Sequence, residues 1–165
     1  MAGLADQAAG KVITILTEPA GLNARLAAFS AEEGGGPVHI SAAQVMAQNV
    51  ALEVAERSGE MQYPAVHVYC ERLVNEMREK FRRFSGRAQM AIDVRLSQDR
   101  LEGIGRKLEG YVEAVTQVLD RNRGDWSAGM FYTGGYEVAF GPVKRGGKNF
   151  VQGAKVTFAV EISRS

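Results

Sequence analysis

The chain has 165 residues, of which 45% are hydrophobic and 24% are charged, so its composition excludes an intrinsically disordered protein and its length suits a single domain, residues 1–165, with a sizeable core. Twenty lysines and arginines almost balance nineteen aspartates and glutamates, which excludes an overall field that would draw the molecule onto nucleic acid or an anionic membrane. A single cysteine excludes an internal disulfide and favours a reducing cytoplasm, and we expect no export signal and no membrane partner.

Two helices and a hinge are predicted in residues 1–36. Apolar residues recur at helical spacing through residues 3–17, and Pro19 ends that pattern. The segment GLNARLAAFSAEE predicts a second, shorter helix. Its acidic end is followed by the residues of a flexible hinge, which are Gly34, Gly35, Gly36 and Pro37.

Residues 38–58 fit two interpretations, and the sequence leaves both open. Ser41 and Gln44 match the capping box of a helix, with Ile40 and Val45 as its hydrophobic staple. Apolar residues further along alternate as they would in a strand; they are Val50, Leu52 and Val54.

A strand and then a basic segment are predicted next. PAVHVYCE predicts a strand with Val66, Val68 and Cys70 on one face. LVNEMREKFRRF predicts a helix, because its apolar residues are spaced by four, four and three positions, and an extended β-arm is the alternative. Those apolar residues are Leu73, Met77, Phe81 and Phe84.

The clearest strand is GRAQMAIDVRLS, in which apolar side chains alternate with polar or small ones. The strongest helix follows it, with Ser97 as the predicted cap and Leu96 and Leu101 as a staple. Its apolar stripe consists of Leu101, Ile104, Leu108, Tyr111, Val115 and Val118. Three glycines interrupt the helix, Gly103, Gly105 and Gly110, which leads us to infer close packing against a sheet or a second subunit.

Two strands and a cationic loop are predicted at the C-terminal end. RNRGDWSAG ends the helix, and alternating residues then predict one strand around Val138 and a long one from Phe150 to Ile162. The predicted hairpin tip between them consists of Lys144, Arg145, Gly146, Gly147 and Lys148. The order of elements predicts an α+β fold, with a largely antiparallel sheet closed by a C-terminal β-hairpin and with helices packed on one face.

The residue types that carry out most chemistry are sparse. His39, His67 and Cys70 do not form a zinc-binding pattern, and His67 and Cys70 point to opposite faces of their strand. VKRGGKNF lacks the spacing and the following helix of a phosphate-binding loop. We therefore expect no catalytic residues, no metal and no cofactor, and a protein that is not an enzyme.

The densest basic cluster lies in REKFRRFSGR, where five cations alternate with two phenylalanines. The cations are Arg78, Lys80, Arg82, Arg83 and Arg87. One interpretation is a platform for single-stranded nucleic acid, with bases stacked on Phe81 and Phe84. The other is a protein interface or core stripe with arginines outside, which the near-zero net charge and the neighbouring Glu76 and Glu79 favour.

The order of elements from YPAVHVYCE, through MAIDVRLSQDRLEGIGRKLEGYVEAVTQVLDRNRGDW, to GGYEVAFGPVKRGGKNFVQGAKVTFAVEIS resembles the tail-terminator, or tail-completion, proteins of long-tailed bacteriophages and prophages. The resemblance covers residues 63–163 and consists of a Tyr-Pro strand entry, an alternating strand, a helix with a central tyrosine and a closing hairpin. It implies a small α+β protein that forms a ring, usually of six subunits, on the head-proximal end of the tail tube.

The resemblance also implies the partners. These are other copies of the chain in a ring, the tail tube protein and a neck or connector protein, with genomic DNA at most passing through the lumen. Assembly takes place in the cytoplasm of the host bacterium, and the final location is the head–tail junction of the virion. Both cationic segments, 144–148 and 78–87, become candidate contact arms. A head-completion or neck adaptor protein and a small nucleic-acid-binding module are the alternatives.

Overall fold

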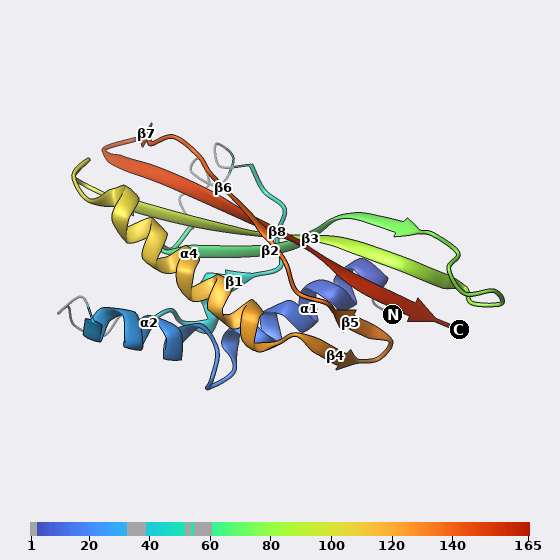
Figure 1. The fold of residues 1–165 in the computed structure, drawn as a ribbon. Coiled ribbons are helices and arrows are strands. Elements are labelled where there is room, and N and C mark those ends of the chain that lie inside the picture. The colour runs from blue at the N-terminus through green and yellow to red at the C-terminus, as the bar shows by residue number, and fades with distance from the viewer. Residues whose placement is uncertain (1–2, 33–38, 52–53, 55–60) are drawn as a thin grey trace.

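One curled, largely antiparallel sheet organises the fold, and helices lie along one of its faces (Figure 1). This computed structural model describes residues 3–32, 39–51, 54 and 61–165. The predicted hinge at Gly34–Gly36 and the strand pattern at Leu52 lie outside the described residues. The helical elements are α1 (Leu4–Thr17), α2 (Leu22–Glu32), the 3-10 turn η1 (Ala42–Gln44) and α4 (Ile104–Arg121). The strands are β1 (Val45–Met46), β2 (Ala65–Asn75), β3 (Phe84–Gln98), β4 (Gly124–Ser127), β5 (Met130–Tyr132), β6 (Glu137–Phe140), β7 (Lys144–Gly146) and β8 (Asn149–Arg164).

The long strand β8 is the centre of the sheet. The strand order of the sheet is β1-β2-β3-β8-β5-β4, and β6 and β7 also pair with β8. One edge of β8 pairs with β3 in an unbroken antiparallel register, and the other edge pairs successively with β7, β6 and β5. Only β1 and β2 run parallel among the described pairs. The predicted α+β fold with a largely antiparallel sheet and a C-terminal hairpin is confirmed.

The core lies between the helices and one face of the sheet. Alternate residues of β3 and β8 are fully buried there, as the two-residue period of a half-buried strand requires. Leu108 and Val115 of α4 are also fully buried, and α4 packs on both of these strands. The strand positions that face the core are Met90, Ile92, Val94, Val156, Phe158, Val160 and Ile162.

The start of α4 differs from the prediction. Ser97 is not a helix cap, because β3 continues through it and pairs Ser97 with Val151. Gly103 stands at the cap position instead, with a φ of 78° that a residue with a side chain rarely adopts. Leu101, the predicted first contact of the apolar stripe, precedes the helix and is 58% exposed.

The structure shows why one of the glycines inside α4, Gly110, has no side chain. A Cβ atom built at Gly110 would lie 2.6 Å from the ring of Phe29 in α2, so the missing side chain lets the two helices approach closely. The inference of close backbone packing is therefore correct at this position, although the neighbour is a helix of the same chain rather than the sheet or a second subunit.

The predicted cap at Ser41 is followed by a three-residue turn. Ser41 and Gln44 form both hydrogen bonds of a capping box, yet only the three-residue turn η1 follows before β1 begins. Gln44 also donates from Nε2 to the carbonyl oxygen of Pro64, at 2.9 Å. Because Gln44 ties η1 to the entry of β2, the chain turns into a sheet edge here rather than continuing as a helix.

Tyr132 occupies the centre of an aromatic cluster near one end of β8. Its ring is fully buried, and its centroid lies 5.5 Å from that of Trp126 and 5.5 Å from that of Phe158. The hydroxyl donates a hydrogen bond to the carbonyl oxygen of Gly135, at 2.9 Å. Burial, and then the charge of Asp120, raises the pKa of Tyr132 to about 12.

This pKa predicts a loss of stability in strong alkali. The unfolded chain releases the Tyr132 proton near pH 10, whereas the folded chain keeps it until about pH 12. The stability that comes from keeping Tyr132 protonated is complete below pH 10 and is lost as the pH rises towards 12. Between these two values the free energy of unfolding falls by about 1.4 kcal/mol per pH unit. Urea unfolding of the native protein and of Tyr132→Phe at pH 9, 10 and 11 measures this slope. Parallel slopes in the two proteins would contradict the prediction.

Candidate interface arm

The β2–β3 hairpin extends beyond the helices as an arm, which we define as residues 72–89. Figure 1 shows its turn at the end of the molecule where both termini lie, well away from β7. β2 is buried on both faces at its start and largely exposed after Cys70, where its pairing with β3 shifts register between Cys70 and Arg72. In the arm the β2 strand is therefore largely exposed, whereas the β3 strand stays paired with β8 and mostly buried.

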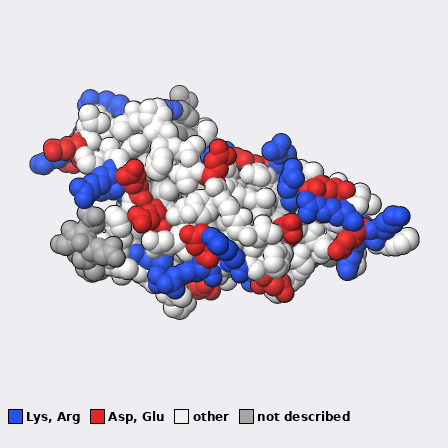
Figure 2. Space-filling model, viewed as in Figure 1, with Lys and Arg blue, Asp and Glu red and all other residues white. Residues whose placement is uncertain are grey.

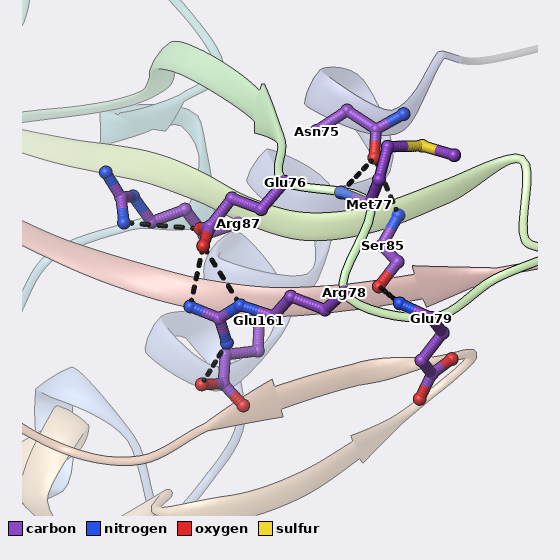
Figure 3. Close-up of polar contacts among 8 residues, drawn as sticks. All are labelled: Asn75, Glu76, Met77, Arg78, Glu79, Ser85, Arg87 and Glu161. Atoms are coloured by element: carbon purple, nitrogen blue, oxygen red, sulfur yellow. Dashed lines mark hydrogen bonds and ion pairs between the residues drawn. The ribbon is translucent and has the colours of Figure 1, made fainter.

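Residues 76–83 form the turn of the arm, where the sequence predicted a helix. The helix prediction is wrong, and the alternative of an extended β-arm is correct. Asn75 holds the turn with its side chain: Oδ1 accepts from the backbone N–H of Met77 at 3.3 Å and of Ser85 at 3.1 Å (Figure 3), and Nδ2 donates to the carbonyl oxygen of Arg83 at 3.2 Å. Such side-chain bonds to backbone compete directly with helix formation.

Ser85, which is buried, fixes the opposite side of the turn. Its carbonyl oxygen accepts from the backbone N–H of Glu76 at 3.1 Å and of Arg78 at 3.3 Å. Its hydroxyl oxygen accepts from the backbone N–H of Glu79 at 2.8 Å (Figure 3). The Glu79 carboxylate in turn accepts from the hydroxyl of Ser163 in β8, at 2.6 Å. The turn is thus bonded to itself and to the end of the central strand.

Ion pairs connect the arm to β8. Arg78 lies 2.9 Å from a carboxylate oxygen of Glu76 and 3.1 Å from one of Glu161, and Arg87 lies 3.2 Å from Glu76 (Figure 3). The bonds to Glu76 and Glu161 raise the pKa of Arg78 above its ordinary value. Since all four side chains are partly exposed, these pairs contribute little to stability individually.

The five predicted contact cations of the arm therefore divide into two groups. Arg78, Arg82 and Arg87 pair with carboxylates of the same chain, with Arg82 at 3.3 Å from Glu79. Lys80 and Arg83 form no ion pair with another described residue. Figure 2 shows positive and negative side chains intermixed over this end of the molecule. The arginines mainly brace the arm, which the sequence alone did not indicate.

The turn presents apolar side chains at its tip. Phe81 is 101% exposed and Met77 is 56% exposed. Both residues have a positive φ, 68° for Phe81 and 51° for Met77, a region that bulky residues rarely occupy. The helical spacing of the sequence placed both residues on one apolar stripe, whereas they lie exposed in the turn of a β-arm.

No family model matches this sequence, and no curated protein matches it.

The second predicted contact segment lies at the other end of the molecule (Figure 1). Lys144, Arg145 and Gly146 form strand β7 rather than a loop, so the hairpin tip is only Gly147 and Lys148. Gly147 has a φ of 64°, which a tight hairpin turn requires. The guanidinium of Arg145 lies over the ring of Phe150, 5.4 Å from its centroid. The two cationic segments are therefore not brought together into one site.

The structure removes part of the proposed nucleic-acid platform. Phe84 begins β3, is only 8% exposed and packs in the core, so its ring cannot stack on a base. Phe81 alone remains available, and three of the five neighbouring cations already face carboxylates. A platform needs several successive stacking rings along a cationic track.

His67 and Cys70 do not form a reactive pair. His67 is buried with Nδ1 3.4 Å from a guanidinium nitrogen of Arg95, and burial, followed by the charge of Arg95, lowers its pKa. Cys70 packs against the core on the other face, and burial raises the pKa of its thiol. Within the described residues, no three His, Cys, Asp or Glu side chains are placed to share a metal ion, and none of the helices is long and apolar enough to cross a membrane.

The sheet face away from the helices carries a charged cluster. The Lys155 ammonium pairs with the Glu71 carboxylate and lies 5.8 Å from the ring centroid of Tyr69. Its bond to Glu71 raises the pKa of Lys155, and burial raises the pKa of Tyr69. Beside them Arg95 lies 3.3 Å from the Asp93 carboxylate. These charges are matched within the chain, which suits a structural face better than a site of turnover.

Proposed function

We propose that the chain is a structural virion protein of a long-tailed bacteriophage or prophage, which forms a homo-oligomeric ring at the head–tail junction. The ring caps the tail tube on one face and joins it to the neck or connector on the other. The subunit number expected from the resemblance is six, and genomic DNA at most passes through the lumen. Function resides in fitted surfaces rather than in a reaction.

One observation carries the proposal: a projecting arm that is fixed by hydrogen bonds and presents a fully exposed aromatic ring. Asn75 and Ser85 each accept or donate several bonds to the turn, so the tip is held in place before any partner arrives. Aromatic side chains are enriched among residues that dominate binding energy, and a preorganised one loses little freedom on binding. Phe81 meets both conditions.

The α+β fold and the order of its elements also support the proposal. The alternating strand, the helix with Tyr111 at its centre and the closing β6–β8 hairpin correspond to the pattern of tail-terminator proteins. An exposed tip makes no contact in an isolated subunit. A subunit of a head-to-tail ring, by contrast, needs a different contact surface on each side, and the tip can serve as one of them.

Capping of tail tubes tests the proposal. The purified protein is mixed with tubes polymerised from the tail tube protein of the same phage or prophage, and tube ends are imaged by negative-stain electron microscopy. We expect a ring-shaped density at one end of each tube and an arrest of further growth. The control variant Leu101→Ala removes an exposed apolar side chain outside the arm and should cap normally.

Two other outcomes would redirect the assignment. Binding to the connector or portal without binding to tubes would make the protein a head-completion or neck adaptor. A protein that binds neither component, yet is folded by circular dichroism, would contradict a role at the junction.

A further inference from the structure

A groove of about 290 Å³ between α1 and the β4–β5 turn contains two cations without an ionic partner. They come from different elements, Lys11 from α1 and Arg164 from the end of β8. Neither forms an ion pair with another described residue, and no aspartate or glutamate is among the described residues that line the groove. Asp125, which is close by in the sequence of the turn, accepts instead from the backbone N–H of Ser127 at 2.7 Å. The groove is therefore positively charged without an internal counter-charge.

The charge of this groove is set by residues that the structure describes. In the sequence, the undescribed residues nearest to α1 are 1–2, a methionine and an alanine, whose side chains carry no charge. The described neighbours of the other undescribed segments lie far away. Val50 accepts a hydrogen bond from Arg95, which lies eleven residues along β3 from Phe84, the residue that pairs with Arg164. Eleven residues of strand span about 36 Å. Figure 1 shows the C-terminal end of α2 at the end of the molecule opposite to both termini.

Arg164 has a donor that no described residue accepts. Its Nη2 donates to Oε1 of Gln7 at 2.6 Å, which anchors the guanidinium group to α1. Its Nε is buried and has no hydrogen-bond partner among the described residues. A buried donor without an acceptor is unfavourable, and the guanidinium group is well suited to a carboxylate. Arg164 is thus fixed in position with one donor still to be satisfied.

Gly10 leaves room beside the two cations. It lies inside α1 and in the wall of the groove, although glycine is among the least favourable residues in a helix interior. A Cβ atom built at Gly10 would meet nothing within 4 Å, whereas one at Gly110 in α4 would meet the ring of Phe29. Packing within the described chain therefore requires glycine at Gly110 but not at Gly10. A molecule that enters the groove would benefit from the close approach that Gly10 allows.

The apolar part of the groove favours a protein side chain over a small inorganic anion. Trp126 and Met130 line it and are only 5% and 3% exposed, and Ala128 adds a further apolar side chain. The methylene groups of a glutamate, or an apolar neighbour of an aspartate, gain by covering this wall. A phosphate ion would lose hydration against it without compensation. An acidic peptide segment satisfies both the charge and the apolar wall.

We propose that this groove is a docking site for an acidic segment of a partner protein, whose carboxylate lies between Lys11 and Arg164. Gly10 lets the backbone of that segment come close to α1. The site is inferred from the single chain and does not rest on the proposed function. Either one can therefore fail without the other.

Trp126 makes the site measurable, because it is the only tryptophan in the chain and it lines the groove. A blocked tetraglutamate peptide is titrated into the native protein at low salt while the emission of Trp126 is recorded. We expect a saturable change in emission, and weaker binding as the salt concentration is raised, because salt screens the charges. A blocked tetraglutamine peptide and inorganic phosphate are the ligand controls and should change the emission little.

Two variants separate the charge of the site from its shape. Lys11→Gln should weaken binding of the acidic peptide at least about fivefold, because one charged contact is lost. Gly10→Leu keeps both cations, fills the groove and should abolish binding. Leucine is the better helix residue, so this variant should remain folded by circular dichroism. Lys107→Gln is the matched control, because it removes an exposed lysine of α4 that does not line the groove, and it should bind as the native protein does.

Three results would overturn the proposal. The first is an emission of Trp126 that does not respond to millimolar tetraglutamate peptide. The second is an equal response to the tetraglutamine peptide or to phosphate, which would mean a site without selectivity for carboxylates of a protein. The third is an unchanged affinity in Lys11→Gln or in Gly10→Leu, which would place the bound peptide elsewhere on the molecule.

Discussion

Replacing Phe158 by alanine is expected to lower the free energy of unfolding by about 3–5 kcal/mol, the range for removal of a buried phenylalanine. Phe158 is 2% exposed at the middle of β8, and its ring packs edge-on against Tyr132, with centroids 5.5 Å apart. Both the apolar burial and this aromatic contact are lost, and a cavity remains. Urea unfolding followed by circular dichroism measures the change, and for a chain of this length the melting temperature should fall by about 10 °C.

Phe81→Ala is the matched control for this prediction, because it makes the same chemical change on a fully exposed ring. Its effect on stability should stay within about 0.5 kcal/mol. Equal losses in the two variants would mean that Phe81 is buried in the isolated protein and would contradict the description of the arm.

Gly86→Ala should open the arm. A Cβ atom at Gly86 would lie 1.9 Å from the carbonyl oxygen of Val74 and 2.8 Å from the backbone nitrogen of Glu76. Both are backbone atoms, so the two strands of the arm must separate, at a cost of about 3 kcal/mol. Trypsin measures the result, since Lys80, Arg82 and Arg83 lie exposed in the turn and opening should release the turn backbone from Asn75 and Ser85, which allows rapid cleavage.

The control for Gly86→Ala is Gly10→Ala. Gly10 lies inside α1 and a Cβ atom there would meet nothing within 4 Å, so alanine should stabilise the helix by about 0.5–1 kcal/mol. Cleavage of the arm should be unchanged in this variant. A Gly86→Ala protein as resistant to trypsin as the native protein would refute the tight packing of β2 against β3 at the arm.

The elements that bury one face were predictable from sequence. In β3 and β8 every second residue is apolar, and the strand that results needs one buried face whatever its neighbours are. α1 was predictable for the same reason at helical period. These patterns were sufficient for the α+β fold and for the helices on one face of the sheet.

The arm was not predictable, because its structure depends on residues far away in sequence. Apolar residues at helical spacing from Leu73 to Phe84 suggested a helix, yet Phe84 pairs with Arg164 and the turn bonds to Ser163. Without β8 nothing would distinguish a helix from a hairpin here. Tertiary pairing overrides local propensity in such segments.

The short strands and the start of α4 were missed for related reasons. β4 and β5 have only four and three residues, too few for a periodic pattern, and β5 exists because β8 offers it an edge. Gly103 suits the cap of α4 through its backbone conformation rather than through a capping side chain, so the Ser97 pattern was misleading.

The charge pattern located the candidate arm but did not show which of its cations pair within the chain. The cluster from Arg78 to Arg87 is visible in sequence, whereas the pairing of Arg78 with Glu161, 83 residues away, is not.

The position of β8 after all the strands that pair with it has a consequence for synthesis. Four strands from earlier in the sequence pair with β8, so none of them can complete its pairing until residues 149–164 have left the ribosome. The sheet should therefore form slowly and only after these residues have been made, as expected when distant segments must meet. A polypeptide cut short before residue 149 would lack the strand to which Glu79 and Arg78 bond, so both the centre of the sheet and the bracing of the arm would be missing from it.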